Sequence, residues 1–180
     1  MMMVKGEYLY GHKLRGKFYV DDKLEYEVEY LYNKKYNGKG YDENGNTIYE
    51  LNNGTGKVKE YNNYGYLIFE GEYLNRKRNG KVKVYDDNGK LRFEGEYLNG
   101  ERNGKGKEYI WRNLIFEGEY LNGKRSGKGK IYSEDKLIFE CEYLNGERNG
   151  KGKEYYDIDI LKFEGEYLNG KKWKRKKILL

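Results

Sequence analysis

Apolar and charged positions alternate along most of the chain. In the stretch 91–97, Leu91, Phe93 and Tyr97 alternate with charged residues, and Gly95 holds the apolar position between the two rings. A period of two is typical of a β-strand with one ring-bearing face and one charged face. In the stretch 104–107, glycine alternates with lysine in the same way. The pattern therefore predicts two strands, and it needs no helix.

The pair Asn99-Gly100 lies between these two predicted strands. Asn-Gly favours the positive φ angles of a type I′ hairpin turn. A two-residue loop at this pair would set the pairing across the hairpin as Gly95 with Gly104, Phe93 with Gly106 and Glu94 with Lys105. A longer loop over Gly-Glu-Arg-Asn would shift individual pairs. With the shorter loop, opposite charges meet across the strands and the rings lie over glycine backbone.

The predicted hairpin is one copy of a repeated phrase. "FEGEYLNGERNGKGKEY" begins at Phe93, and close copies begin at 69, 116, 139 and 163, so the steps are 24, 23, 23 and 24 residues. Such regularity marks a repeat protein. Weaker copies begin near 4, 26 and 49. The copy near Tyr49 is four residues shorter between its aromatic residue and its second glycine, which predicts a local bend or a lost hairpin tip.

We therefore predict an all-β fold, an elongated single-sheet antiparallel meander of β-hairpins that forms a solenoid-like ribbon. The array covers 1–170 in about eight units, starting near residues 4, 26, 49, 69, 93, 116, 139 and 163, and a basic C-terminal tail covers 171–180. One unit cannot bury its own rings, so neighbouring units must stabilise one another. The predicted repeat core consists of Phe69, Gly71, Tyr73, Phe93, Gly95, Tyr97, Phe116, Gly118, Tyr120, Phe139, Cys141, Tyr143, Phe163, Gly165 and Tyr167.

Composition and charge narrow the class of protein. Charged residues make up 37% of the chain, which would suit a disordered protein, but the 17% aromatic content argues for a packed core. The net charge is +6, and the six bases of the tail account for it, because the remaining 30 lysines and arginines equal the 30 acids. A nucleic-acid platform usually carries a basic face along its length. We therefore expect no nucleic-acid partner.

The expected location is the cytoplasm. The sequence has no leading apolar run typical of a signal peptide and no apolar span of membrane-crossing length. The single cysteine, Cys141, excludes an intramolecular disulfide and fits a reducing compartment.

The sequence offers little that could do chemistry. His12 and Cys141 lie six repeats apart, so no cysteine-histidine dyad is expected within one chain, and two such residues are too few for a zinc site. Cys141 replaces the glycine of the other copies, which favours a small buried residue over a reactive thiol. Glu94, Glu96 and their copies each lie near lysine, which favours a solvated paired face over a general acid and base. We expect no enzyme, no cofactor and no metal.

The repeat resembles the MORN (membrane occupation and recognition nexus) family. The resemblance rests on the motif Phe93-x-Gly95-x-Tyr97 and on the glycines that follow it, Gly100, Gly104 and Gly106. The stretch "NGKLRFEGEYLNGERNGK" is also similar to related repeats of bacterial antitoxin-like proteins. The resemblance implies a β-hairpin scaffold, in some members with a role at membranes or in dimerisation. Larger members add a lipid kinase or lysine methyltransferase domain, and here no residues remain outside the repeats to form one.

Four functions remain open at this point. The leading hypothesis is a non-catalytic scaffold that binds a partner protein, or a second copy as a homodimer, through the aromatic face. The second is a peripheral membrane adaptor that binds anionic lipid through Lys171, Lys172, Lys174, Arg175, Lys176 and Lys177. These lysines also suit protection of an exposed sheet edge. The remaining two are an antitoxin and a repeat that binds glycan or choline, against which the missing export signal weighs.

One more group of residues recurs at equivalent tip positions. We expect these side chains to form a solvated line along one rim, diluted by neighbouring acids, rather than an anion-binding surface. They are Arg78, Arg102, Arg125 and Arg148.

Overall fold

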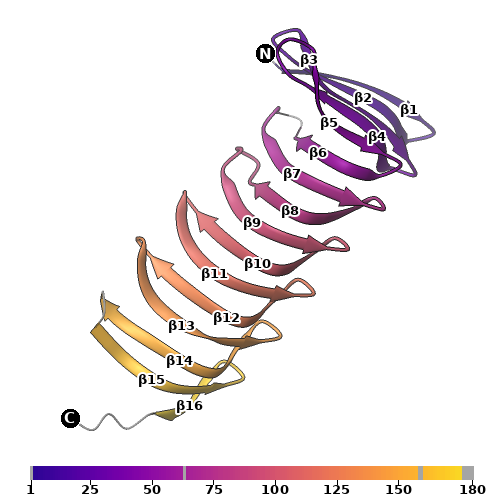
Figure 1. Cartoon of the computed structure of the whole chain (residues 1–180). Coiled ribbons are helices and arrows are strands. Elements are labelled where there is room, and N and C mark those ends of the chain that lie inside the picture. The colour runs from indigo at the N-terminus through magenta and orange to yellow at the C-terminus, as the bar shows by residue number, and fades with distance from the viewer. Residues whose placement is uncertain (1, 63, 158–159, 176–180) are drawn as a thin grey trace. The chain divides into compact units, whose positions relative to one another are not determined.

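The computed structural model describes residues 2–62, 64–157 and 160–175. Within these ranges there are sixteen strands and no helix (Figure 1). The strands are β1 (Met2–Leu9), β2 (His12–Val20), β3 (Lys23–Leu31), β4 (Lys34–Tyr41), β5 (Thr47–Asn52), β6 (Thr55–Tyr61), β7 (Leu67–Leu74), β8 (Lys77–Tyr85), β9 (Leu91–Leu98), β10 (Glu101–Ile110), β11 (Asn113–Leu121), β12 (Lys124–Ser133), β13 (Lys136–Leu144), β14 (Glu147–Asp157), β15 (Ile160–Leu168) and β16 (Lys171–Arg175).

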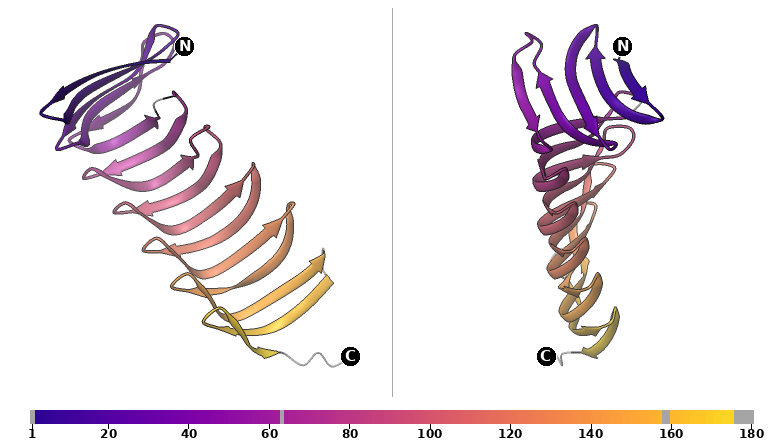
Figure 2. Two further views of the ribbon diagram at one scale, coloured as in Figure 1. Left: turned by 180° about the vertical axis from the view of Figure 1, so that it is seen from behind. Right: turned by 90° about the vertical axis from the view of Figure 1, so that its right-hand side faces the viewer.

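The strands form one open antiparallel sheet in the order of the sequence, from β1 to β16. The predicted all-β hairpin meander is confirmed. The chain divides into two compact units: Met1–Lys90 with Tyr97–Gly100, and Leu91–Glu96 with Glu101–Leu180. In the second unit the strands are visibly bowed along their length (Figure 2). Each unit is described by itself below.

The hairpin tips are two-residue turns, as the Asn-Gly pairs predict. In the hairpin of β11 and β12, Leu121 pairs with Lys124, and the turn residues Asn122 and Gly123 have φ angles of 50° and 78°. Positive φ at both positions defines a type I′ turn, whose twist matches that of the flanking strands. Asn tolerates this backbone region better than most side chains do, and glycine adopts it freely.

The predicted pairing across the hairpin is wrong, because the returning strand contains a bulge. In the second unit, Gly118 pairs with Gly129 and Tyr120 pairs with Arg125. The two-residue interval from Gly118 to Tyr120 on β11 therefore lies opposite a four-residue interval from Arg125 to Gly129 on β12. Gly127 lies among the additional residues, and its φ of 69° suits only glycine well.

The same bulge corrects the expected pairs of the hairpin of β9 and β10. A Cβ added to Gly95 would lie 2.7 Å from the Cα of Gly106, so Gly95 lies against Gly106 and not against Gly104. Gly104 instead has a φ of 86° in the bulge. The expected pairing of Phe93 with Gly106 and of Glu94 with Lys105 shifts with it. Phe93 still covers Gly106, since an added Cβ there would lie 2.6 Å from the ring.

Neighbouring hairpins join through a glycine-centred seam. Between β10 and β11, Gly106 pairs with Gly118, and lysines of β10 face glutamates of β11 on both sides of this pair. The seam between β14 and β15 repeats the arrangement around Gly152 and Gly165. In each seam, the lysines of one strand lie opposite the glutamates of the next strand. These pairs of opposite charge favour a single register for the seam.

The short repeat near Tyr49 keeps its hairpin tip. Asn53 and Gly54 form the turn, with φ angles of 51° and 74°. Pairing between β5 and β6 is limited to Leu51 with Gly56 and Asn52 with Thr55. In this part of the first unit, Tyr61 of β6 donates a hydrogen bond to Glu25 of β3 at 2.6 Å, so strands far apart in the order come close. The outcome is a short hairpin with its tip intact, at which strands on either side come close.

The core of the second unit consists largely of rings, whereas the buried apolar residues of the first unit are two rings and four aliphatic side chains. The buried apolar residues of the described ranges are Tyr26, Val28, Leu51, Val58, Phe69, Val82, Phe93, Phe116, Tyr120, Phe139, Cys141, Tyr143, Phe163 and Tyr167.

Candidate functional site

The ring layer of the second unit brings together the predicted phenylalanine, glycine and tyrosine positions. Phe116 is 1% exposed and lies over Gly118 and Gly129. The ring of Tyr120 meets the rings of Phe93 and Phe116 edge to face, with centroids 5.6 and 5.7 Å apart. The rings of neighbouring hairpins therefore lie on one side of the sheet and pack against one another.

The expected line of solvated arginines is not found. Arg125 lies over the Phe116 ring at 3.8 Å from guanidinium carbon to ring centroid, and Arg102 and Arg148 cover Phe93 and Phe139 in the same way at 4.2 and 4.1 Å. In the first unit, Arg78 covers Phe69 at 4.1 Å. A guanidinium stacked on a ring shields apolar surface while it keeps its charge. These arginines are lids of the ring layer and not a free anion-binding rim.

A carboxylate fixes the arginine lids of the second unit. Glu108 accepts hydrogen bonds from Arg102 at 2.9 Å, from Arg125 at 2.8 Å and from the hydroxyl of Tyr120. Burial alone would raise the pKa of Glu108, but the hydrogen bonds from Tyr120 and Arg125 and the positive charges outweigh it and lower the pKa. Burial also raises the pKa of Tyr120 above its ordinary value.

The next hairpin lacks this carboxylate. Ile131 holds the place that corresponds to Glu108, since it pairs with Phe139 as Glu108 pairs with Phe116. The hydroxyl of Tyr143 is buried and has no hydrogen-bond partner. Among the described residues, Arg148 of the following hairpin, formed by β13 and β14, makes no ion pair with a carboxylate, although it covers Phe139. An unpartnered buried hydroxyl costs stability.

Ile131→Glu is therefore expected to raise the free energy of unfolding by about 1 to 2 kcal/mol. The new carboxylate would accept the hydrogen bond of Tyr143 and would pair with Arg148, as Glu108 does for Tyr120 and Arg125. Urea unfolding followed by circular dichroism measures the change. Ile131→Leu serves as the control and is expected to leave stability close to that of the parent chain. A lower stability for the glutamate variant would contradict the interpretation.

The first unit contains a denser charge cluster that sequence reasoning missed. Glu60 of β6 lies 3.5 Å from the Lys35 ammonium and 3.1 Å from Arg78, and it accepts a hydrogen bond from Tyr73. Lys35 comes from β4, so the cluster joins strands on both sides of the short hairpin. Burial lowers the pKa of Lys35 to about 8, against the opposing effect of Glu60. No local signal in the sequence marks this lysine, because its partner lies 25 residues away.

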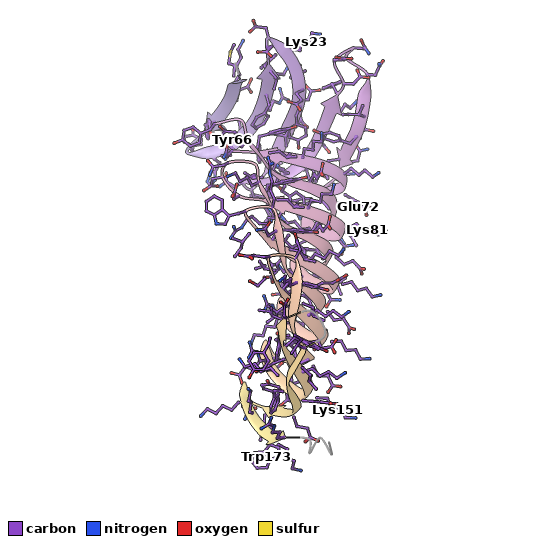
Figure 3. The ribbon with its side chains drawn as sticks, turned by 90° about the vertical axis from the view of Figure 1, so that its left-hand side faces the viewer. Lys23, Tyr66, Glu72, Lys81, Lys151 and Trp173 are labelled. Atoms are coloured by element: carbon purple, nitrogen blue, oxygen red, sulfur yellow. The ribbon has the colours of Figure 1, made fainter. Side chains whose placement is uncertain are left out.

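The charged face of the sheet carries a ladder of exposed ion pairs. Lys83 and Glu70 approach to 3.4 Å, and Lys107 and Glu117 approach to 3.8 Å. In Figure 3, Glu72 and Lys81 extend from the same side of the first unit. Exposed pairs of this kind contribute little to stability, but they neutralise the face.

A row of exposed leucines marks the hairpin tips of the second unit. The leucine row consists of Leu121, Leu144 and Leu168, which are 55%, 54% and 45% exposed. Each ends the first strand of its hairpin, directly before the turn. In the first unit, Leu9, Leu31, Leu74 and Leu98 hold the same place in their hairpins and are exposed as well. Sequence reasoning passed over these positions because it assigned the apolar surface to the rings.

Part of the predicted basic tail is a strand of the sheet. Its first five residues form strand β16, which pairs with β15. Lys172 lies over the Phe163 ring and donates to Glu154 at 2.9 Å, so it acts as an arginine lid does. Trp173 is exposed at the end of this unit (Figure 3). Lys176 and Lys177 lie outside the described residues, and lipid binding by the basic segment stays a prediction.

The two residues considered for chemistry lie in different units. Cys141 is buried in β13, and burial raises the pKa of its thiol to about 11, which disfavours the reactive thiolate near neutral pH. His12 begins β2, where its Nδ1 lies 2.9 Å from the side-chain amide of Asn33. In the described ranges, no group of three or more His, Cys, Asp or Glu residues could hold a metal ion. The same ranges contain no helix that could cross a membrane.

Comparison with known proteins places these hairpins in a family. A family model described as MORN repeat matches residues 93–112, 116–137 and 140–158. These stretches contain most of β9 to β14, where the ring layer and its arginine lids lie. No curated protein matches the chain. MORN repeats are in general non-catalytic repeats associated with interactions at membranes and with proteins. The matched hairpins and their shared ring layer show that residues 93–158 of this chain consist of MORN repeats.

Proposed function

We propose that this protein is a non-catalytic scaffold that binds a partner protein along the leucine row. The observation that carries the proposal is the regular exposure of Leu121, Leu144 and Leu168, one per hairpin. Exposed apolar surface in a regular line is typical of a binding site, whereas single exposed leucines are ordinary. The leucines gain nothing for the fold by their exposure, so a partner that covers them would gain their burial.

The aromatic face is less suited to binding than the sequence suggested. Phe93, Phe116 and Phe139 are buried under arginine side chains. A partner would have to displace these guanidinium groups, two of which are held by Glu108. The proposed contact surface is therefore the row of tips and not the ring layer.

The spacing of the row favours a helical partner. Neighbouring strands lie about 4.8 Å apart, so equivalent residues of successive hairpins recur about every 9.6 Å. An α-helix rises about 1.5 Å per residue, so apolar residues seven positions apart recur about every 10.5 Å. A helix with an apolar residue at every seventh position would therefore match the three leucines closely.

The charges beside the row point to a helix with mixed charge. The residues that pair with the leucines after each turn are Lys124, Glu147 and Lys171. They alternate in sign along the tips, so a helix with both acidic and basic flanking residues would pair with them better than a helix of one sign.

Capture from native cytosol tests the proposal. The protein carrying Leu121→Ser, Leu144→Ser and Leu168→Ser is expected to retain a bound protein at least about tenfold less than the parent chain. The matched control replaces three exposed isoleucines at the other ends of the strands, Ile110, Ile138 and Ile160, with serine. Quantitative mass spectrometry compares the three samples, and circular dichroism checks that each sheet is intact. Equal capture by the leucine variant and the parent chain would reject the leucine row.

A further inference from the structure

The strands carry charges in a regular order around the glycine-centred positions. From β2 onward, the charged residues beside these central positions are glutamates on odd-numbered strands and lysines or arginine on even-numbered strands, and one flanking position in each of β4 and β5 is an uncharged asparagine. In the second unit, for example, Glu117 and Glu119 flank Gly118 in β11, and Lys128 and Lys130 flank Gly129 in β12. Each seam between hairpins therefore joins an acidic strand to a basic one.

Strand β1 departs from this order. Its central residues are Lys5, Gly6 and Glu7, one base and one acid around the glycine. In its own hairpin Lys5 pairs in register with Lys17, so like charges are placed opposite each other. The Lys5 ammonium lies instead near the Tyr19 ring, 5.4 Å from its centroid. A glutamate at position 5 would suit the hairpin better, so the lysine calls for another explanation.

Glu7 also lacks the ion pair that its register offers. It faces Arg15 across the hairpin, but Arg15 pairs with Glu29 of β3 at 3.4 Å. In the part of the chain that the structure describes, Glu7 makes no ion pair. The acid and the base at the centre of β1 are therefore both open to an external partner.

The outer edge of β1 is not paired with any strand of the described residues. β1 is the first strand of the sheet, and within the described ranges it pairs only with β2. Tyr8 is 62% exposed, whereas the equivalent Tyr120 is 4% exposed because Phe93 and Glu108 of the preceding hairpin cover it. An unpaired edge with exposed side chains is a template for another strand.

We infer that β1 pairs antiparallel with β1 of a second copy, around a two-fold axis at Gly6. In this register Gly6 faces Gly6 of the partner subunit, and Lys5 faces Glu7 of the partner subunit. The symmetry makes the second pair identical, with Glu7 facing Lys5 of the partner subunit. The contact reproduces the seam in which Gly106 meets Gly118 between lysine and glutamate pairs. Two-fold pairing uses the same edge of both copies and closes at a dimer.

The other edge of the sheet does not support such pairing. The charged residues of β16, which are Lys171, Lys172, Lys174 and Arg175, are all positive. Two copies of this strand would place like charges opposite each other in any register. Of the two edge strands, β1 alone carries charges that complement themselves.

Charge exchange at positions 5 and 7 tests the dimer without dependence on the leucine row. The parent chain, with no residues added before Met1, is expected to sediment as a dimer, and its dissociation constant should rise with salt. Lys5→Glu and Glu7→Lys should each weaken the dimer more than tenfold, because each places like charges opposite each other twice. Mixed in equal amounts, the two variants should form a heterodimer. The double variant Lys5→Glu with Glu7→Lys should restore the homodimer.

The results of these experiments either support or overturn the proposed β1 dimer. A monomeric parent chain, or variants that dimerise as well as the parent chain, would overturn the inference. Lys5→Glu also removes the like-charged pair with Lys17, so the folded monomer should not be destabilised. Circular dichroism should show an intact sheet in this variant, and loss of the dimer cannot then be attributed to unfolding. The serine variant of the leucine row should remain a dimer, which separates failure of this inference from failure of the proposed partner surface.

Discussion

Gly118→Ala is expected to lower the free energy of unfolding by about 2 to 3 kcal/mol. A Cβ at this position would lie 2.6 Å from the Phe116 ring and 2.8 Å from both the Cα of Gly129 and the carbonyl oxygen of Lys128. Two of these atoms belong to the backbone of the facing strand, so no side-chain rotation can relieve the overlap. The strands must move apart and lose hydrogen bonds. Urea unfolding followed by circular dichroism measures the loss.

Gly16→Ala is the matched control. A Cβ at Gly16 would lie 3.4 Å from the Phe18 ring and 3.5 Å from Val28, which are ordinary packing distances. This substitution is expected to change stability by less than about 1 kcal/mol. Equal losses at the two sites would show that the alanine effect is general to the strands and not due to rings seated on glycine.

Raising the pH above 10 is expected to unfold the protein. Burial raises the pKa of Tyr30 to about 12, and burial or hydrogen bonds to glutamate also raise the pKa of Tyr26, Tyr49, Tyr61, Tyr73, Tyr109, Tyr120 and Tyr167. Below pH 10 these groups are protonated in both the folded and the unfolded chain, so their full contribution to stability is present. Above pH 10 the unfolded chain ionises first, and stability falls as the pH rises towards the folded values.

One group acts in the opposite direction at lower pH. The folded pKa of Lys35 is about 8, below its ordinary value of 10.5, so between these values the unfolded chain binds more protons and stability rises with pH. Tyrosinate absorbance and circular dichroism, recorded together in a pH titration, follow the alkaline transition. The two signals should change together above pH 10. Ionisation of the buried tyrosines near pH 10 with the sheet intact would contradict the expectation.

The period of two and the Asn-Gly pairs were sufficient to predict the strands and turns. Phe93, Gly95 and Tyr97 alternate with charges, and this local pattern has one good solution, a strand with a ring-bearing face. The turn at Asn99 and Gly100 follows equally from local backbone preference. These features depend on residues close in sequence, which is why the all-β hairpin fold could be predicted.

The register and the arginine lids could not be predicted by the same means. Gly104 and Gly127 look like ordinary strand positions in the alternating pattern, but their positive φ angles make the bulge that shifts the pairing. Arg125 looks like an exposed tip residue, yet it reaches back over Phe116 and binds Glu108 of the preceding hairpin. The contact depends on the bulge and on the next hairpin together, so no single repeat reveals it.

The charge cluster of the first unit likewise could not be predicted from any single repeat. Lys35 and Glu60 belong to different hairpins, and they meet where pairing between β5 and β6 is limited to two residue pairs. The shortened repeat indicated an irregularity near Tyr49. Which side chains would meet there depended on the curvature of the sheet, which the sequence pattern does not specify.

The glycine-centred seams have a consequence for how the chain could change in length. The seam before the hairpin of β11 and β12 joins Gly106 to Gly118, and the seam after it joins Gly129 to Cys141, each between lysines on one strand and glutamates on the other. If this hairpin were deleted as a whole, β10 would meet β13 with the same order of charges. Duplication of a hairpin would likewise create a junction of the existing kind. Gene rearrangements that add or remove one repeat can therefore lengthen or shorten the leucine row by one leucine without the formation of a new kind of seam.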